Sequence, residues 1–284
     1  MTTPDSFHVP DGPHDIRLVV CDMDGTLLDA AKRIPDALWP LVDHMRERGI
    51  VFAPASGRQH ATLARQFERL GEGLVVIAEN GSYVARGGVE ISSSPLPDGV
   101  LGDIVAAVRD HARAGFDVGT VVCGKRSAYI ERDDAAFVEK ASPYYAALEI
   151  VDDLAAVDDA ILKVAVYDFG NAAHDTAPVL ARFQGDLAVV VSDRHWIDIM
   201  RTGVHKGVAV ARLQEALGVT PEQTVVFGDY LNDLEMMDRG HLSFAMANAH
   251  PDVAQRARYR APSNVDAGVI TTLRRLLDHP LTSS

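Results

Sequence analysis

The chain has little cysteine and no long apolar run. It contains two cysteines, Cys21 and Cys123, in 284 residues. This number excludes a disulfide framework and a thiolate metal site, and it suits a reducing compartment. No apolar run reaches the length that spans a membrane. The first 14 residues are polar, include Pro10 and Pro13, and lack the hydrophobic core of a signal peptide. We therefore expect a flexible leader and a cytoplasmic protein.

Basic residues are also scarce. Lys and Arg number 27 against 40 Asp and Glu, which gives a formal net charge of -13. The acidic excess argues against nucleic acid or an anionic membrane as a partner. A small phosphorylated substrate stays compatible, because a bound cation can reverse the local field. Apolar residues make up 47% of the chain, and its length suits two domains.

The stretch from Leu18 to Thr26 carries the first chemical signal. An apolar, β-branched run predicts a buried strand that stops at Asp22 and Asp24. Carboxylates spaced i and i+2 on a strand point to the same side, and Gly25 permits a sharp turn close to a ligand. Ligands of open α/β sheets bind at the carboxyl ends of strands. The same Asp-x-Asp-Gly pattern is also typical of a plain polar turn.

The pattern along the chain predicts two domains. Strands and helices alternate over residues 15–83 and again over 201–284, which indicates a parallel sheet with right-handed crossovers. Between them, residues 84–200 contain two predicted hairpins, around 124–125 and 193–195, with intervening helices. We therefore predict an α/β protein with a doubly wound parallel sheet core and an inserted α+β domain.

Four polar clusters follow strands or begin helices of the predicted core. They are Asp22 with Asp24, Ser56-Gly57, Lys206-Gly207, and Asp229 with Asn232-Asp233. Their order and spacing resemble the haloacid dehalogenase superfamily of phosphohydrolases. The position of the insertion, between the second and third clusters, resembles the Cof-type subfamily with its C2B-type cap. Two further motifs resemble the same subfamily, namely Asn80-Gly81 and Gly-Asp-Tyr-Leu-Asn-Asp at 228–233. Residues 264–269 are similar to a further signature of the family, from which Val265 and Ala267 depart. The resemblance implies a Rossmann-like core and a cap.

The resemblance also implies roles for the acidic residues. Asp22 would be the nucleophile that forms an aspartyl-phosphate, and Asp24 would be the general acid and then the general base. The implied metal ligands are the Asp22 carboxylate, the Asp24 backbone carbonyl and the Asp229 carboxylate. Carboxylates without His or Cys partners suit a hard cation, so we expect Mg²⁺ rather than Zn²⁺.

A second group of residues is expected to bind phosphate. It comprises the Met23, Gly25 and Gly57 amides, the Ser56 hydroxyl, the Lys206 ammonium and the Asn232 amide. The resemblance supports this set, and a helix N-terminus after Gly57 would favour an anion. Ser56 is alternatively a helix cap, and Lys206 is alternatively a solvated lysine at a helix start.

Three more residues are expected near the site. Asp233 would orient Lys206 or metal-bound water, with a surface carboxylate as the alternative. Arg58 would lie at the mouth of the site and touch substrate or cap, with a solvated arginine at a helix start as the alternative. Asn80 would lie near the substrate. The cap residues that select the substrate carry no motif.

The sequence thus predicts a Mg²⁺-dependent phosphatase of small phosphorylated metabolites, such as sugar phosphates or a phosphorylated cofactor. A sugar phosphomutase of the same fold and a catalytically silent metabolite-binding protein are the alternatives. Free phosphate released from a sugar 1-phosphate would favour the phosphatase over the mutase. No feature points to nucleic acid, a membrane or a particular oligomeric state.

Overall fold

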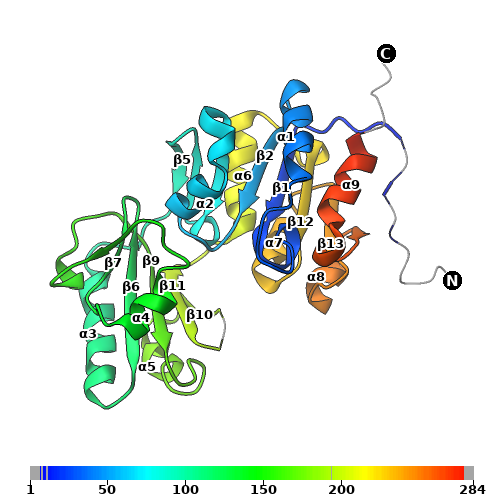
Figure 1. The fold of residues 1–284 in the computed structure, drawn as a ribbon. Coiled ribbons are helices and arrows are strands. Elements are labelled where there is room, and N and C mark those ends of the chain that lie inside the picture. Colours follow the sequence, from blue (N-terminus) through cyan, green and yellow to red (C-terminus); the bar gives the residue numbers. More distant parts are fainter. Residues whose placement is uncertain (1–6, 8, 11, 193, 278–284) are drawn as a thin grey trace. The chain divides into compact units, whose positions relative to one another are not determined.

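The computed structural model describes residues 7, 9–10, 12–192 and 194–277. Much of the expected leader, namely residues 1–6, 8 and 11, lies outside the described residues, as does Asp193 in the second expected hairpin. The chain divides into two compact units (Figure 1). The first consists of Met1–Ser56, Leu70–Ile91 and His205–Ser284, and the second consists of Gly57–Arg69 and Ser92–Val204.

The first unit is built on a sheet that has eight strands in the described residues. Their order is β14 (Tyr259–Ala261), β13 (Leu242–Met246), β12 (Thr224–Gly228), β1 (Leu18–Asp22), β2 (Val51–Ala55), β3 (Val75–Ala78), β4 (Tyr83–Arg86) and β5 (Val89–Ser93). The strands from β14 to β3 pair in parallel, and β4 pairs antiparallel with β3. The predicted parallel core is confirmed.

Strand β1 occupies the middle of this sheet because it is apolar on both faces. All five of its residues are buried, and it pairs with β12 on one side and β2 on the other. Parallel neighbours align the carboxyl ends of the three strands, so the residues that follow Asp22, Ala55 and Gly228 emerge at one edge. This edge is where the sequence predicts the site.

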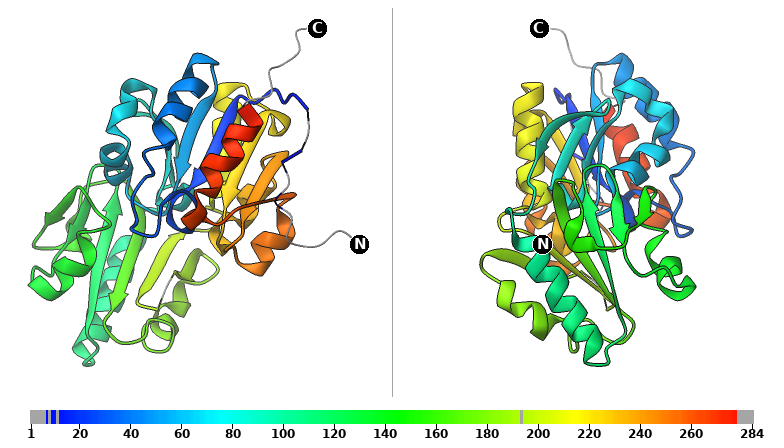
Figure 2. Two further views of the ribbon diagram at one scale, coloured as in Figure 1. Left: turned by 45° about the vertical axis from the view of Figure 1, so that its right-hand side comes forward. Right: turned by 90° about the vertical axis from the view of Figure 1, so that its left-hand side faces the viewer.

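Helices cover both faces of the sheet in the first unit (Figure 2). They are α1 (Leu38–Glu47), α6 (Lys206–Leu217), α7 (Leu234–Met237), α8 (Pro251–Arg256) and α9 (Gly268–Leu277). On one face α1 packs beside α9, and on the other α6 packs beside α7. Helix α1 buries Leu38, Leu41, Val42 and Met45, which recur at the spacing of one helical face.

The second unit has a six-stranded sheet of its own within the described residues. The strand order is β10 (Leu187–Val191), β11 (Trp196–Arg201), β9 (Ile161–Asp168), β6 (Val118–Gly124), β7 (Ala128–Ile130) and β8 (Leu148–Ile150). The pairs β6–β7 and β10–β11 are antiparallel hairpins, as predicted. Helices α3 (Val100–Arg113) and α5 (Ala177–Leu180) pack on one face, and α4 (Ala135–Ala141) packs on the other.

Several local features differ from the sequence prediction. The short strands β8 and β14 were not predicted, since three residues are too few to show periodicity. The helix expected over 59–70 is α2 (His60–Gln66), followed by a 3₁₀ segment over Glu68–Gly73. Residues 57–69 were expected in the core, but they cluster with the second unit, where Gln59 and Thr62 bond to residues 144–147.

The described part of the chain has neither a helix that could span a membrane nor a disulfide. None of its helices combines the length and the apolarity that a membrane crossing needs. Neither cysteine forms a disulfide, and both are buried, Cys21 in β1 and Cys123 in β6. A small buried thiol behaves as an apolar core residue, so neither cysteine is a candidate nucleophile.

Candidate active site

The chain leaves β1 at Asp22 through a tight turn. Gly25 has φ 85°, which glycine adopts without strain. A Cβ at Gly25 would also overlap the carboxylate of Asp229. We predicted that Asp22 and Asp24 lie on the same side of one strand. This is wrong, because Asp24 lies beyond the end of β1 and strand alternation does not align it with Asp22. Instead, the Asp24 carboxylate accepts a hydrogen bond from Lys32 at 3.2 Å.

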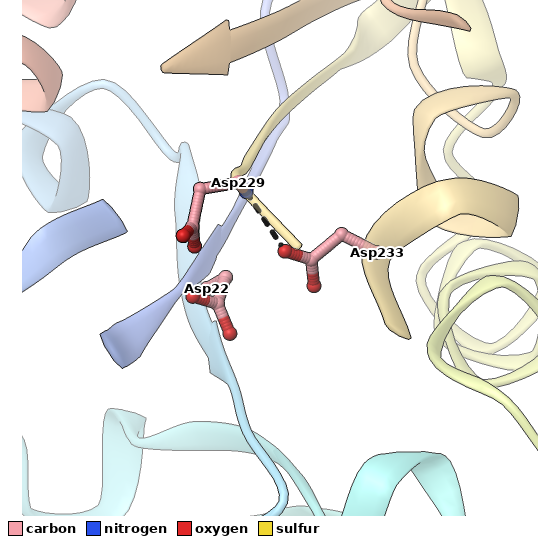
Figure 3. A group of neighbouring side chains, drawn as sticks. All are labelled: Asp22, Asp229 and Asp233. Atoms are coloured by element: carbon pink, nitrogen blue, oxygen red, sulfur yellow. Dashed lines mark hydrogen bonds between the residues drawn. The ribbon is translucent and has the colours of Figure 1, made fainter. Parts of the chain in front are cut away.

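Asp229 follows β12 and meets the turn after β1 from the neighbouring strand. Thr26 donates its hydroxyl to Asp229 Oδ1 at 2.9 Å, which ties the two strand ends together. The carboxylates of Asp22, Asp229 and Asp233 approach so closely that one oxygen of each lies within 4.8 Å of the others. Figure 3 shows these three carboxylates gathered around one space.

Lys206 is the first residue of α6 and carries its charge into this carboxylate group. Its side chain is 0% exposed, so it is not the solvated lysine that the sequence also allowed. The ammonium donates to Asp22 Oδ1 at 2.5 Å and to Asp233 Oδ1 at 2.7 Å. A buried ammonium is stable only with such partners, so Lys206 and the two carboxylates depend on one another.

Asp233 is also fully buried rather than on the surface. One oxygen accepts from Lys206, and the other accepts from the backbone N–H of Asp229 at 2.9 Å and of Tyr230 at 3.2 Å. Both oxygens are therefore engaged in holding Lys206 and the loop after β12. This arrangement suits a residue that orients its neighbours better than a metal ligand.

The electrostatics of the group follow from its composition. Burial is the main cause that raises the pKa of Asp22 well above its usual value, and the negative charge of Asp233 adds to it. Burial likewise raises the pKa of Asp229 to about 6. Burial alone would lower the pKa of Lys206, but Asp22 and Asp233 outweigh it and raise that pKa. Three carboxylates face one ammonium, so the ionised group has an excess of negative charge.

This charge excess fits a divalent cation. Asp22 Oδ2 is buried and, within the described residues, no hydrogen bond reaches it. A buried carboxylate oxygen without a donor is costly, and a cation would satisfy it. The donor set is all oxygen, which suits Mg²⁺. Asp22 and Asp229 are the ligands that this geometry offers, since Asp233 is already satisfied.

Ser56 and Gly57 follow β2 at the same edge of the sheet. Ser56 is buried, its N–H donates to Ile77 at 2.9 Å, and its carbonyl accepts from Asn80 at 3.0 Å. Helix α2 begins at His60 with Gln59 as its N-cap residue, so Ser56 is not the helix cap that the sequence allowed. Arg58 belongs to the second unit, and its role stays a prediction.

Asn80 and Asn232 lie together. Asn232 donates its side-chain amide to Asn80 Oδ1 at 3.1 Å, which joins the loop after β3 to the loop after β12. Asn80 has φ 55°, a left-handed conformation that asparagine tolerates better than most residues. The two motif residues thus form one polar pair beside the carboxylate group.

A hydrogen-bond network that the sequence did not reveal also holds the turn after β1. Asn248, in the loop after β13, donates its side-chain amide to the Gly25 carbonyl at 2.8 Å. Its own oxygen accepts from Ser263 and from the backbone of Asn264, and Asn264 donates to the Leu28 carbonyl at 2.8 Å. The available signal was that Asn248 follows yet another strand of the parallel sheet, and that residues 264–269 resemble a family signature.

Comparison with known proteins identifies the family. The model of the haloacid dehalogenase-like hydrolases matches residues 19–273, which is most of the chain. The protein belongs to this family. As a haloacid dehalogenase-like hydrolase it has the expected Cof-type arrangement, in which a parallel α/β core is interrupted by an α+β insertion.

Relatives of this hydrolase include enzymes with named substrates. A 5-amino-6-(5-phospho-D-ribitylamino)uracil phosphatase of Escherichia coli (strain K12) is 33% identical over 267 residues, covering 93% of this chain and 97% of the relative. A pyridoxal phosphate phosphatase of the same organism is 24% identical, covering 85% and 91%. The crystal structure of a haloacid dehalogenase-like hydrolase from Bacteroides thetaiotaomicron superposes with a TM-score of 0.82 at 24% identity, covering 92% and 99%, and supports the fold.

Proposed function

We propose that this hydrolase is a Mg²⁺-dependent phosphatase that cleaves small phosphorylated metabolites through an aspartyl-phosphate on Asp22. One observation carries the proposal. The Asp22 carboxylate is buried at a strand end and held by Lys206 on one oxygen, while the other oxygen meets no hydrogen-bond donor among the described residues. A carboxylate in such surroundings is oriented for attack, provided that positive charge offsets the repulsion between it and a phosphate anion.

Asp22, Asp24 and Lys206 have different roles in the proposed reaction. Asp22 attacks phosphorus, so a bond from its oxygen to phosphorus forms while the bond to the leaving oxygen breaks. Asp24 gives its proton to that leaving oxygen. The Asp24 carboxylate then takes a proton from water as the water oxygen attacks phosphorus, and Asp22 is released. Lys206 holds the Asp22 carboxylate in place throughout.

The cation would be held by the carboxylates of Asp22 and Asp229, with the Asp24 carbonyl as a third proposed ligand. When bound, Mg²⁺ supplies positive charge that allows an anionic nucleophile to approach an anionic phosphate. The Met23 and Gly25 amides, the Ser56 hydroxyl, the Gly57 amide and the Asn232 amide are proposed to bind the phosphate oxygens. Each of these roles is part of the proposal.

The relatives support a substrate in which a phosphate monoester is joined to a small metabolite. The substrates that these relatives are named for include a phosphoribitylaminouracil and pyridoxal phosphate, both of which carry a heterocycle. We propose a substrate of this class. The test is a panel of phosphorylated metabolites assayed with Mg²⁺ for kcat/KM, including both of these compounds and hexose phosphates. Free phosphate from at least one is expected, whereas an isomeric sugar phosphate would favour a mutase and no turnover would favour a binding protein.

A prediction about the cation concerns Asp229→Asn. Because burial raises the pKa of Asp229 to about 6, the folded metal-free protein favours the protonated carboxyl. The contribution of Asp229 to the stability of the folded protein is complete below the unfolded pKa of about 4 and is lost as the pH rises through about 6. At pH 7.5 the neutral asparagine should therefore raise the Tm of the metal-free protein. Mg²⁺ at about 100 times its Kd should raise the Tm of the wild type by roughly 5 °C and leave the Tm of the variant unchanged.

Asp238→Asn is the matched control. Asp238 is an exposed aspartate of the first unit that pairs with Arg256, so its loss should leave the Mg²⁺-dependent shift intact. Thermal unfolding with and without Mg²⁺ measures all three proteins. An Asp229→Asn variant that Mg²⁺ stabilises as strongly as wild type would contradict the proposed cation site.

A further inference from the structure

The sheet of the second unit contains a buried ion pair outside the carboxylate group described above. Lys163 lies in β9 and Asp198 in the adjacent strand β11, and they are 4% and 7% exposed. Lys163 Nζ lies 3.5 Å from Asp198 Oδ1. The same ammonium donates to the backbone carbonyl of Gly57 at 3.2 Å. Gly57 directly follows Ser56 in the chain, so a charge of the inserted sheet reaches the turn that is proposed to bind phosphate.

A second set of contacts holds the same segment. The Gln59 side chain donates to the Ala147 carbonyl at 2.8 Å and accepts from the Ala147 N–H at 3.0 Å. The Thr62 hydroxyl donates to the Tyr144 carbonyl at 2.9 Å and accepts from the Ala146 N–H at 3.0 Å. All of these residues belong to one compact unit. Residues 57–62 are thus held at two places. One is the Gly57 carbonyl, next to Ser56, and the other is the pair of side chains of Gln59 and Thr62.

A buried charge pair at this position is not explained by stability alone. Taking an ammonium and a carboxylate out of water is costly, and apolar residues of similar size often replace such a pair without loss of stability. The neighbours of Lys163 on its face of the sheet, Ala165 and Tyr167, are packed in an apolar cluster with Val121 and Cys123. An apolar residue at 163 would fit these surroundings, so the buried charge calls for a role.

The role follows from the geometry of the peptide that Lys163 holds. The Gly57 carbonyl and the Arg58 N–H belong to one planar trans peptide, so they point in opposite directions. The peptide before Gly57 is held by the Asn80 N–H, which donates to the Ser56 carbonyl at 3.0 Å, but the free φ and ψ of glycine leave the peptide after it to be fixed by another contact. A hydrogen bond from an ammonium to the Gly57 carbonyl fixes that plane and restricts the Ser56-Gly57 turn beside it.

We propose that Lys163, held by Asp198, is a positioning residue that orients the Ser56-Gly57 turn for phosphate binding. This inference rests on the proposed function, because it assigns Lys163 to the phosphate site of that function. Lys163 acts through Gly57, and Asp198 supplies the charge that keeps the ammonium at this place in the sheet.

The test compares Lys163→Met with the double variant Lys163→Met/Asp198→Leu. A hydrogen bond from a charged donor is lost in both, so the inhibition constant for inorganic phosphate and the KM for a phosphate monoester should rise about tenfold in both. The single variant leaves Asp198 buried without its partner and should also lose thermal stability, whereas the double variant removes both charges and should recover the wild-type Tm. Lys140→Met, at an exposed lysine of α4, is the control and should change nothing.

The double variant separates positioning from structural support. If the pair only stabilises the sheet, the double variant will recover both its Tm and its wild-type affinity for phosphate, and the proposal is overturned. Wild-type affinity in Lys163→Met would overturn it as well. A wild-type protein that neither hydrolyses a phosphate monoester nor binds inorganic phosphate would instead refute the proposed function and this inference together. Binding of inorganic phosphate is measured by calorimetry on the full chain with Mg²⁺.

Discussion

Asp22→Asn is expected to lower kcat for a phosphate monoester by about 10⁵-fold or more, the scale on which enzymes lose activity with their nucleophile. Asparagine keeps the shape of the side chain but cannot form the aspartyl-phosphate. The asparagine oxygen can still accept from Lys206, and Asp233 continues to pair with that ammonium, so the Tm should fall less than in Lys206→Met. Phosphate release from p-nitrophenyl phosphate in the presence of Mg²⁺ measures kcat.

Asp24→Asn is the informative companion. The p-nitrophenolate ion leaves without a proton, so this variant should form the phosphoenzyme from p-nitrophenyl phosphate and stall at its hydrolysis. The two variants therefore lose turnover at different steps. Phosphate release by Asp22→Asn at a rate within tenfold of wild type would be incompatible with a nucleophilic Asp22.

Lys206→Met is expected to combine the second largest loss of activity with a large loss of stability. The ammonium is fully buried and bonded to both Asp22 and Asp233. Removing one partner of a buried ion pair costs about 3–5 kcal/mol, because the charges that stay behind are uncompensated. The free energy of unfolding, measured in urea, should fall by this amount, and kcat/KM should fall by at least about 10³-fold because Asp22 is no longer oriented.

A second substitution distinguishes the two effects. Lys206→Met/Asp233→Asn removes one of the uncompensated carboxylates and should recover part of the lost stability without recovering activity. Arg256→Met is the matched control, since Arg256 pairs with Asp238 on the surface and an exposed pair contributes little. If Lys206→Met keeps wild-type stability and kcat/KM, Lys206 does not have the place in the mechanism proposed here.

The core and the edge of its sheet could be predicted because the strands that lead to the site are marked in the sequence. Strand β1 is an unbroken apolar run that ends at Asp22, and β12 ends in the same manner before Asp229. Parallel pairing then forces these ends to meet, which is why Asp22 and Asp229 are neighbours across more than 200 residues. The helix start at Lys206 was equally clear from its periodicity and from Gly218 at its end.

Other parts of the site left no such mark. The alignment of Asp24 with Asp22 could not be predicted, because β1 ends at Asp22 and Asp24 already lies in the turn that follows. Asp233 was expected to orient Lys206, but a surface carboxylate fits the same sequence pattern, so its complete burial could not be predicted. Asn248 and Lys163 act on backbone carbonyls, which no side-chain pattern reveals. Long-range contacts to the backbone are therefore what the sequence could not supply.

The boundary of the inserted unit shows the same limit. Residues 57–69 continue the core pattern in sequence, so the alternation of strands and helices assigns them to the core. In the structure Gln59 and Thr62 make paired hydrogen bonds to the backbone of residues 144–147, and these contacts assign the segment to the second unit. The expected bounds, an insertion over 84–200 in a core of 15–83 and 201–284, stay a prediction.

The central claim is that Asp22 becomes phosphorylated during turnover. Its most direct test uses Asp24→Asn, in which breakdown of the phosphoenzyme is slowed, with a ³²P-labelled aryl phosphate and Mg²⁺, followed by an acid quench and peptide mapping. The account predicts one hydroxylamine-sensitive acyl phosphate per chain, located on Asp22 and absent when Asp22→Asn is introduced as well. Label on another residue, or wild-type turnover with no labelled protein at any time, would contradict it.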